Sequence, residues 1–189
     1  MLKIREGGHV ELERYYSLME VDFDSEELMS RSSLHRAMMK GSAQLLIAYD
    51  SESGMDGAYV LVLPKNIYGY VLIKYMGVLP WYRGQGIGLE LMRLINRRYS
   101  DSQGIIAEIS HFPDEDKDRV KKLHRFFSRF GYERLDLDYR IKGVETDVYV
   151  KPMKGAWDIA PVAHRILPDF YTRCISASAA RDMLSIGRG

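Results

Sequence analysis

The spacing of apolar residues predicts two helices near the start of the chain. In Val10–Met19, apolar and aromatic side chains recur every three or four positions, which is the period of one helix face. A second helix is expected to begin at a capping box of Asp24 and Glu27. It should end at Gly41, where glycine allows a left-handed turn. The acidic run Glu20–Asp24 between the helices predicts a loop.

Strand-like runs fill the middle of the chain. Polar turn segments separate short apolar runs, and this pattern is typical of consecutive strands. The runs are Gln44–Tyr49, Ala58–Leu63 and Gly69–Val78. A helix is expected after the third run, because Ile87, Leu91, Leu94 and Ile95 share one helical face.

The remaining elements alternate in type as far as residue 151. Gly104–Ser110 is predicted to be a buried strand, and Asp116–Phe130 a helix that ends at Gly131. Two more strands are expected at Tyr132–Ile141 and Thr146–Lys151. The predicted order is therefore two helices, three strands, a helix, a strand, a helix and two strands.

Residues 152–189 follow as an extension. The range Val162–Ile175 has helical periodicity. Together with Trp157 it carries too much apolar surface to remain a free segment in water. We expect the extension to pack on the domain of residues 1–151 and not to form a separate domain. A partner subunit is the other destination that the sequence leaves open.

Composition restricts the class of protein. With 189 residues and 46% hydrophobic content, the chain suffices for one domain with a core. Its formal net charge of +1 gives no general electrostatic reason to expect nucleic acid or a membrane surface as a partner. Cys174 is the only cysteine. A single cysteine can form neither an internal disulfide nor a cysteine-based metal cluster, and we expect no metal.

The ends and the apolar runs of the sequence bear on location. No apolar run approaches the roughly 18 residues of a membrane span. The first residues, MLKIRE, carry charges where a signal peptide would have an apolar core. A cytoplasmic protein is therefore expected.

The most informative segment is residues 76–89, with the sequence MGVLPWYRGQGIGL. A strand leads into a glycine-rich loop, and a helix follows the loop. Glycines allow backbone N–H groups to approach an anion closely, and the positive end of the helix dipole faces the same point. Arg83 and Gln85 can add side-chain donors. This combination predicts a phosphate site.

Other phosphate-binding motifs do not fit this loop. The pattern G-x-x-x-x-G-K-[ST] of the P-loop does not occur in the sequence. The dinucleotide pattern G-x-G-x-x-G fails in both registers, because Leu89 or Leu91 occupies the place of the third glycine. The pattern that fits is R-x-x-G-x-G, which begins at Arg83, with V-x-P before it, beginning at Val78.

This segment resembles the coenzyme A pyrophosphate loop of the GNAT N-acetyltransferase superfamily. The resemblance covers about residues 1–151 and implies an α+β fold, the GNAT fold, in which helices flank a mixed central sheet. It also implies acetyl-CoA as the cosubstrate and direct transfer of an acetyl group to a primary amine in a ternary complex. The cofactor-binding residues that it implies are Met76, Gly77, Val78, Arg83, Gly84, Gln85, Gly86, Ile87, Gly88 and Leu89. The first three would lie beside the pantetheine, and Gly77 would suit a bulge in the strand.

Glu108 is the candidate general base. It interrupts an apolar strand, on the face opposite Ile105, Ala107 and Ile109. Burial disfavours a charged carboxylate, which suits a base that accepts a proton near neutral pH. Some GNAT enzymes have a functional glutamate at this point. The alternative is a glutamate that reaches solvent or pairs with an arginine at a sheet edge.

The general acid that is usual in this family is missing. GNAT enzymes commonly carry F-Y-x-x-x-G-F on the next helix, whereas Phe127 stands in the place of the tyrosine. His124, one turn earlier, could substitute, although a histidine on a helix face is often purely structural. A CoA thiolate is a tolerable leaving group unaided. The absence of the usual tyrosine leaves open a second function, namely a GNAT-fold sensor or scaffold that binds an acyl-CoA without turnover.

The acidic residues between Glu20 and Glu27 fall in the loop that forms the acceptor wall in this family. A cationic amine would be attracted there, so the expected acceptor is a small amine or an amino-terminal group. Glu26 and Glu27 have a second explanation, because acidic residues also complement the positive end of a helix dipole. The sequence does not distinguish a monomer from a homodimer.

Overall fold

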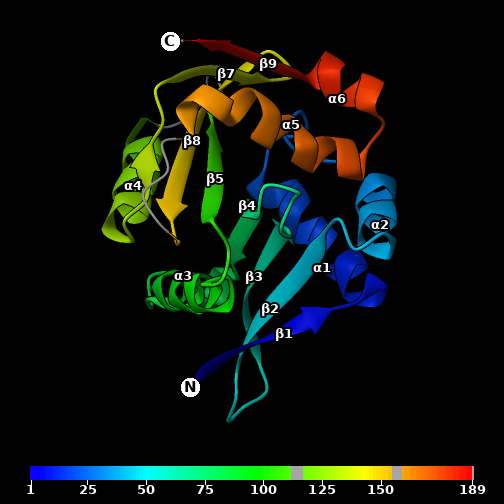
Figure 1. The fold of residues 1–189 in the computed structure, drawn as a ribbon. Coiled ribbons are helices and arrows are strands. Elements are labelled where there is room, and N and C mark those ends of the chain that lie inside the picture. Colours follow the sequence, from blue (N-terminus) through cyan, green and yellow to red (C-terminus); the bar gives the residue numbers. More distant parts are fainter. Residues whose placement is uncertain (112–116, 155–158, 189) are drawn as a thin grey trace. The chain divides into compact units, whose positions relative to one another are not determined.

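The computed structural model of the protein describes residues 1–111, 117–154 and 159–188 (Figure 1). The chain divides into two compact units. The first unit comprises Met1–Pro64 and Ile73–Ser100, and the second comprises Lys65–Leu72 and Asp101–Gly189.

Antiparallel strands form the sheet of the first unit. β1 (Leu2–Gly7) pairs with β2 (Gln44–Asp50), and β2 pairs with β3 (Asp56–Leu63). β4 (Tyr70–Val78) follows β3 in the strand order, and its residues from Ile73 onward belong to this unit. β3 is almost entirely buried, and so the run of apolar residues that predicted it reflects burial on both faces.

β1 is absent from the sequence-based prediction. Leu2 and Ile4 alternate with Lys3 and Arg5, the pattern of a strand with one buried face. The run is short and charged, so the pattern alone is weak. Pairing with β2, in which Leu2 lies opposite Asp50, makes it a strand.

The two helices of the first unit differ from the prediction at their adjoining ends. α1 (His9–Asp22) continues through most of the acidic run that was expected to be a loop. α2 (Arg31–Met39) begins later than predicted, and its N-cap is Ser30, whose hydroxyl accepts from the Ser33 N–H at 3.3 Å. Asp24 instead accepts from the Glu26 N–H at 2.9 Å within a local turn.

Ion pairs explain why α1 tolerates its acidic C-terminal end, which the helix dipole disfavours. Glu20 lies 3.5 Å from Arg31, and Asp22 lies 2.7 Å from Arg83. These partners are distant in sequence, so a local pattern could not reveal them.

After β4 come η1 (Pro80–Tyr82) and α3 (Ile87–Arg98), whose buried face includes Leu91 as predicted.

A second antiparallel ladder organises the second unit. β5 (Gly104–Ser110) pairs with β8 (Val144–Pro152), and β8 pairs with β7 (Leu137–Ile141). β7 in turn pairs with β9 (Leu184–Arg188). The single strand predicted at 132–141 is instead split into β6 (Glu133–Arg134) and β7, both paired with β8. The pairing register with β8 changes between the two segments: Arg134 lies opposite Tyr149, whereas Arg140, six positions further along, lies opposite Glu145, only four positions back along β8.

The helices of the second unit are α4 (Lys117–Arg129), α5 (Ala163–Cys174) and α6 (Ala177–Met183), with a short η2 (Ala160–Val162) before α5. α5 lies within the range predicted to be helical. Asp116 and Trp157, which entered the predictions, lie outside the described residues.

The extension contributes to the core of the second unit. Ile166, Phe170 and Tyr171 of α5 are buried. The Asn66 amide donates to the Ile166 carbonyl at 3.2 Å, and β9, which the sequence did not predict, pairs with β7. These contacts join residues 159–188 to residues 65–72 and 101–154 in one compact unit.

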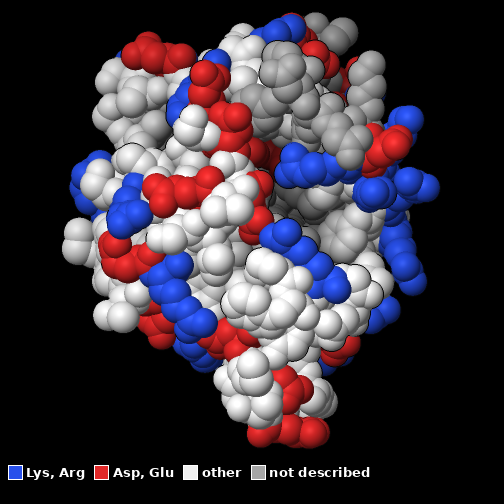
Figure 2. All heavy atoms as spheres, turned by 180° about the vertical axis from the view of Figure 1, so that it is seen from behind, with Lys and Arg blue, Asp and Glu red and all other residues white. Residues whose placement is uncertain are grey.

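No helix among the described residues is long and apolar enough to cross a membrane. On the face drawn in Figure 2, acidic and basic side chains are interspersed, in keeping with the near-neutral formal charge of the sequence.

Candidate functional site

The glycine-rich loop has the backbone that an anion site needs. Gly84 and Gly86 have φ of +77° and +80°, a left-handed conformation that favours glycine. A Cβ added at either residue would meet no described atom within 4 Å. The glycines are therefore required by backbone conformation, and the space above them is open. Gly86 is also the N-cap of α3.

The loop presents a row of unused donors. Over the described part of the chain, the backbone N–H groups from Gly84 to Gly88 have no hydrogen-bond partner. The N–H groups of Leu89 and Glu90 both donate to the Gly86 carbonyl, at 3.0 and 3.1 Å. Consecutive free N–H groups at a helix start form a concave anion site. Leu89, which was predicted to join the site, uses its N–H inside the helix.

The two side chains expected to help with a phosphate are already engaged. Arg83 donates from Nε to the Val78 carbonyl at 3.0 Å, besides its ion pair with Asp22. The Gln85 amide donates to the Trp81 carbonyl at 2.9 Å. In this structure both side chains therefore hold the loop and its flanking strand in place.

Gly77 has a close neighbour that explains why it is glycine. A Cβ added there would lie 2.5 Å from the ring of Tyr59. The Tyr59 hydroxyl donates to Asp22 at 3.1 Å, and Asp22 also pairs with Arg83. Burial, together with the charge and hydrogen bond of Asp22, raises the pKa of Tyr59 above its ordinary value. These contacts link α1, β3, the end of β4 and the loop.

A hollow of about 340 Å³ lies beside the start of α3. Its lining includes Gln85, Gly86 and Ile87, but also the carboxylates of Asp50 and Glu90. The N-terminal ammonium of Met1 lines the same hollow and pairs with Asp50 at 2.8 Å, which offsets the negative charge of that carboxylate.

In the second unit, Glu108 lies between two tyrosines. The Tyr139 hydroxyl donates to Oε1 at 2.9 Å, and the Tyr171 hydroxyl donates to Oε2 at 2.5 Å. Tyr139 and Tyr171 are buried, and Glu108 is partly exposed. Burial and the adjacent Glu108 charge raise the pKa of Tyr139 well above its ordinary value. The carboxylate is thus held by two donors, one of them from the C-terminal extension.

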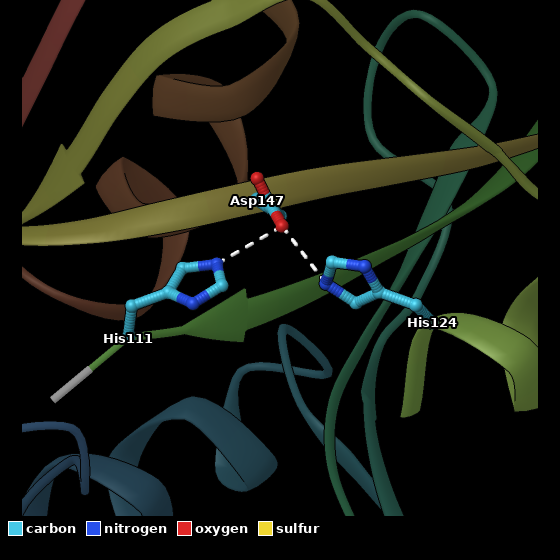
Figure 3. A group of neighbouring side chains, drawn as sticks. All are labelled: His111, His124 and Asp147. Carbon is cyan, nitrogen blue, oxygen red and sulfur yellow. Dashed lines mark ion pairs between the residues drawn. The ribbon is translucent and has the colours of Figure 1, made fainter. Parts of the chain in front are cut away.

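Phe127 and His124 are on α4. The Phe127 ring is only 6% exposed and stacks on Tyr149 with centroids 5.7 Å apart, so it serves as a core residue and offers no proton. His124 directs Nε2 toward Asp147 at 3.0 Å (Figure 3). Glu108 and His124 do not share a face, because alternation along β5 and β8 puts Glu108 and Asp147 on opposite sides of the ladder.

Fold and loop together define a class of protein, namely one with a glycine-rich strand–loop–helix junction whose free N–H groups face outward from the start of a helix. Family comparison narrows the class. The acetyltransferase (GNAT) domain matches residues 41–134, and many solved GNAT structures share the fold. The chain belongs to the GNAT acetyltransferase superfamily. No curated protein matches the sequence.

Solved structures are similar in fold over most of their length. A protein of the GNAT family from Bacteroides thetaiotaomicron has a TM-score of 0.71 at 15% identity, over 90% of this chain and 96% of its own. The ribosomal-protein-S18-alanine N-acetyltransferase of Escherichia coli has a TM-score of 0.59 at 12% identity, over 84% and 97%. A mutant form of the spermidine/spermine N-acetyltransferase of Vibrio cholerae has a TM-score of 0.55 at 13% identity, over 79% and 92%.

Sequence reasoning missed the residues that support these sites. Tyr59 and Asp22 brace the loop, and Tyr139 and Tyr171 hold Glu108. Each tyrosine fits the apolar pattern of its own strand or helix. A buried tyrosine hydroxyl needs a hydrogen-bond partner. That requirement was the one signal in the sequence that these tyrosines would contact polar residues.

Proposed function

We propose that the protein is an acetyl-CoA-dependent N-acetyltransferase that transfers an acetyl group directly to a primary amine in a ternary complex. The observation that carries the proposal is the row of unpartnered N–H groups from Gly84 to Gly88 at the start of α3. Such a row, with the positive end of the helix dipole behind it, suits the pyrophosphate of coenzyme A.

Within this proposal, the end of β4 guides the pantetheine. The residues Met76, Gly77 and Val78 offer backbone groups there, and an N–H fixed near the thioester carbonyl would stabilise the oxyanion of the tetrahedral intermediate. The ion pair of Arg83 with Asp22 keeps this strand end in register with the loop. Holding the thioester in one orientation is the largest contribution that the site can make to rate.

Glu108 is proposed as the group that removes a proton from the attacking ammonium, directly or through a water molecule. The neutral amine then attacks the thioester carbonyl, the C–S bond breaks, and CoA leaves as a thiolate. The second proton on the nitrogen passes to water, which leaves the neutral amide. Tyr139 and Tyr171 position the carboxylate by donating to its two oxygens.

The acceptor is proposed to be an amine, either of a small molecule or of a protein amino terminus. The two named enzymes of similar fold support this, since their names specify an alanine of a ribosomal protein and a polyamine. The acidic run gives less support than expected for a cationic acceptor, because Glu20 and Asp22 are already paired with arginines.

Calorimetry with acetyl-CoA tests the cofactor site. Gly86→Val should abolish most of the affinity, because a β-branched residue resists a φ of +80° and its side chain would cover the donors. Gly41→Val is a matched control, since Gly41 has a φ of +67° and equally open surroundings. It should cost stability yet leave affinity intact. Unchanged affinity in Gly86→Val would refute the assignment.

A second function is favoured by one observation, namely that Phe127 is a buried core residue where the family commonly has a tyrosine. A protein without this proton donor could bind an acyl-CoA as a sensor or scaffold. Release of free CoA thiol in the presence of a panel of amines distinguishes the two functions. Acetyl-CoA binding without thiol release for any amine would favour the sensor.

A further inference from the structure

Potential metal ligands from separate elements converge in the second unit. His111 directly follows β5, His124 lies in α4, and Asp147 lies on β8 (Figure 3). The ligand atoms of the three residues all lie within 4.8 Å of one another. They form the one such group of histidine, cysteine and acidic side chains found in the described ranges.

The strand register brings two of these residues together. Ile109 of β5 lies opposite Asp147 of β8, and the His111 N–H extends the ladder by donating to the Glu145 carbonyl at 2.8 Å. His111 and Asp147 are therefore diagonal neighbours on one face. α4 packs on the same face, since the His124 ring lies 5.5 Å from the ring of Tyr149.

Both imidazoles point at one carboxylate oxygen. Nε2 of His111 lies 2.9 Å from Asp147 Oδ2, and Nε2 of His124 lies 3.0 Å from it. His124 Nε2 and Asp147 Oδ2 are buried, yet neither forms a hydrogen bond with any described residue. Buried polar atoms are normally satisfied. Atoms this close but not aligned for hydrogen bonding are arranged as ligands that face a common point.

We propose that His111, His124 and Asp147 bind a divalent transition-metal ion, of which Zn²⁺ is the best match. Two imidazoles and one carboxylate are a donor set that zinc favours, whereas Mg²⁺ and Ca²⁺ take oxygen ligands. Metal–ligand bonds of about 2.0–2.2 Å in a tetrahedron place ligand atoms about 3.4 Å apart. The observed separations from Asp147 Oδ2, 2.9 and 3.0 Å, require only small side-chain shifts.

Arg134 prepares the carboxylate for this role. Its guanidinium donates to Asp147 Oδ1 at 2.9 Å and leaves Oδ2 directed at the histidines. An outer hydrogen bond of this kind orients a ligating carboxylate. The positive charge also offsets part of the attraction for a cation, so the site should bind less tightly than a closed site with four protein ligands.

The ion would connect β5, α4 and β8 on the side of the ladder opposite Glu108. It therefore does not take part in the proton transfer proposed for Glu108. Its expected effect is on stability, since an ion that binds only the folded chain favours that state. Three protein ligands would leave the fourth position to water.

Metal analysis after dialysis of the chelator-treated full-length protein against Zn²⁺ tests the site. The expected result is one Zn²⁺ per chain and a thermal unfolding midpoint that rises with Zn²⁺ concentration. X-ray absorption of the zinc-loaded parent protein should show imidazole ligands. No bound zinc, or zinc without imidazole ligands, would overturn the proposal.

Variants assign the ligands. His124→Ala should weaken zinc binding by more than the roughly 10- to 100-fold typical of an outer-shell partner. His164→Ala, on the exposed side of α5, is the matched control and should bind as the parent does. His9 and His35 form the other pair of neighbouring histidines. His35→Ala disrupts this pair and should also leave zinc binding intact. Parent-like zinc affinity in folded His124→Ala would overturn the site, and if that variant does not fold, the parent's absorption spectrum decides.

Discussion

Gly77 lies so close to Tyr59 that a Cβ added to the glycine would be 2.5 Å from the tyrosine ring. The contact joins the end of β4, which we propose guides the cofactor, to a buried phenol whose hydroxyl donates to Asp22. Gly77 is thus constrained by packing. A bulge, for which the sequence had suggested this glycine, is not needed to explain it.

Gly77→Ala is expected to destabilise the protein by about 1–3 kcal/mol, the usual cost of overpacking a core. Chemical denaturation measures this. Gly57→Ala is the control, because a Cβ there would be 3.6 Å from its nearest neighbour, an ordinary contact. In a Gly77→Ala/Tyr59→Ala double variant the two losses should be less than additive. Strictly additive losses would show that the contact between Gly77 and Tyr59 does not affect the stability of the protein.

Raising the pH above about 10 should destabilise the protein in part through Tyr59. Burial and Asp22 raise the pKa of Tyr59 above the ordinary value of 10. The folded state therefore holds this proton more tightly than the unfolded state does. Its stabilising contribution is complete below pH 10 and is lost as pH rises toward the folded-state pKa.

Thermal unfolding followed by circular dichroism between pH 8 and about pH 11 checks this slope. Tyr59→Phe should lose stability less steeply with pH than the parent. Tyr68→Phe, at an exposed position, should retain the parent's slope. An identical slope in all three proteins would show that Tyr59 does not contribute.

Glu108→Gln should lower kcat by about 10²-fold and leave acetyl-CoA affinity unchanged, if the carboxylate acts as general base. Steady-state kinetics at a pH below the pKa of the amine measures the effect. Glu145→Gln changes an exposed glutamate on β8 and serves as the control. Activity of Glu108→Gln within threefold of the parent would place the base elsewhere or in solvent.

Phe170→Ala should destabilise the protein by about 3–5 kcal/mol, as expected for truncation of a fully buried aromatic side chain. Arg165→Ala, on the exposed side of the same helix, should change stability by no more than about 0.5 kcal/mol. Denaturant midpoints compare the variants. Sedimentation is expected to show the same association state for both, because the buried face of α5 already packs within its own unit. A change of association state in Phe170→Ala would instead assign this helix to a subunit interface.

The sequence by itself determined the superfamily, the glycine-rich loop between strand and helix, and most elements of the fold. These features depend on the conformational preferences and apolar spacing of residues that are close together in the sequence. Gly84 and Gly86 are needed where the backbone turns left-handed, and apolar periodicity marks a helix face or a buried strand whatever surrounds it. For the same reason the predicted strand–loop–helix at residues 76–89 agrees with β4, η1 and α3.

Only the tertiary structure decided which polar groups meet. Asp22 belongs to α1 because Arg83, 61 positions away, pairs with it. The partners of Glu108 come from β7 and from the extension, and His124 faces a carboxylate on β8. Such contacts depend on strand register and on the packing of distant elements. No spacing along the chain encodes them, because each residue on its own matches the ordinary pattern of its helix or strand.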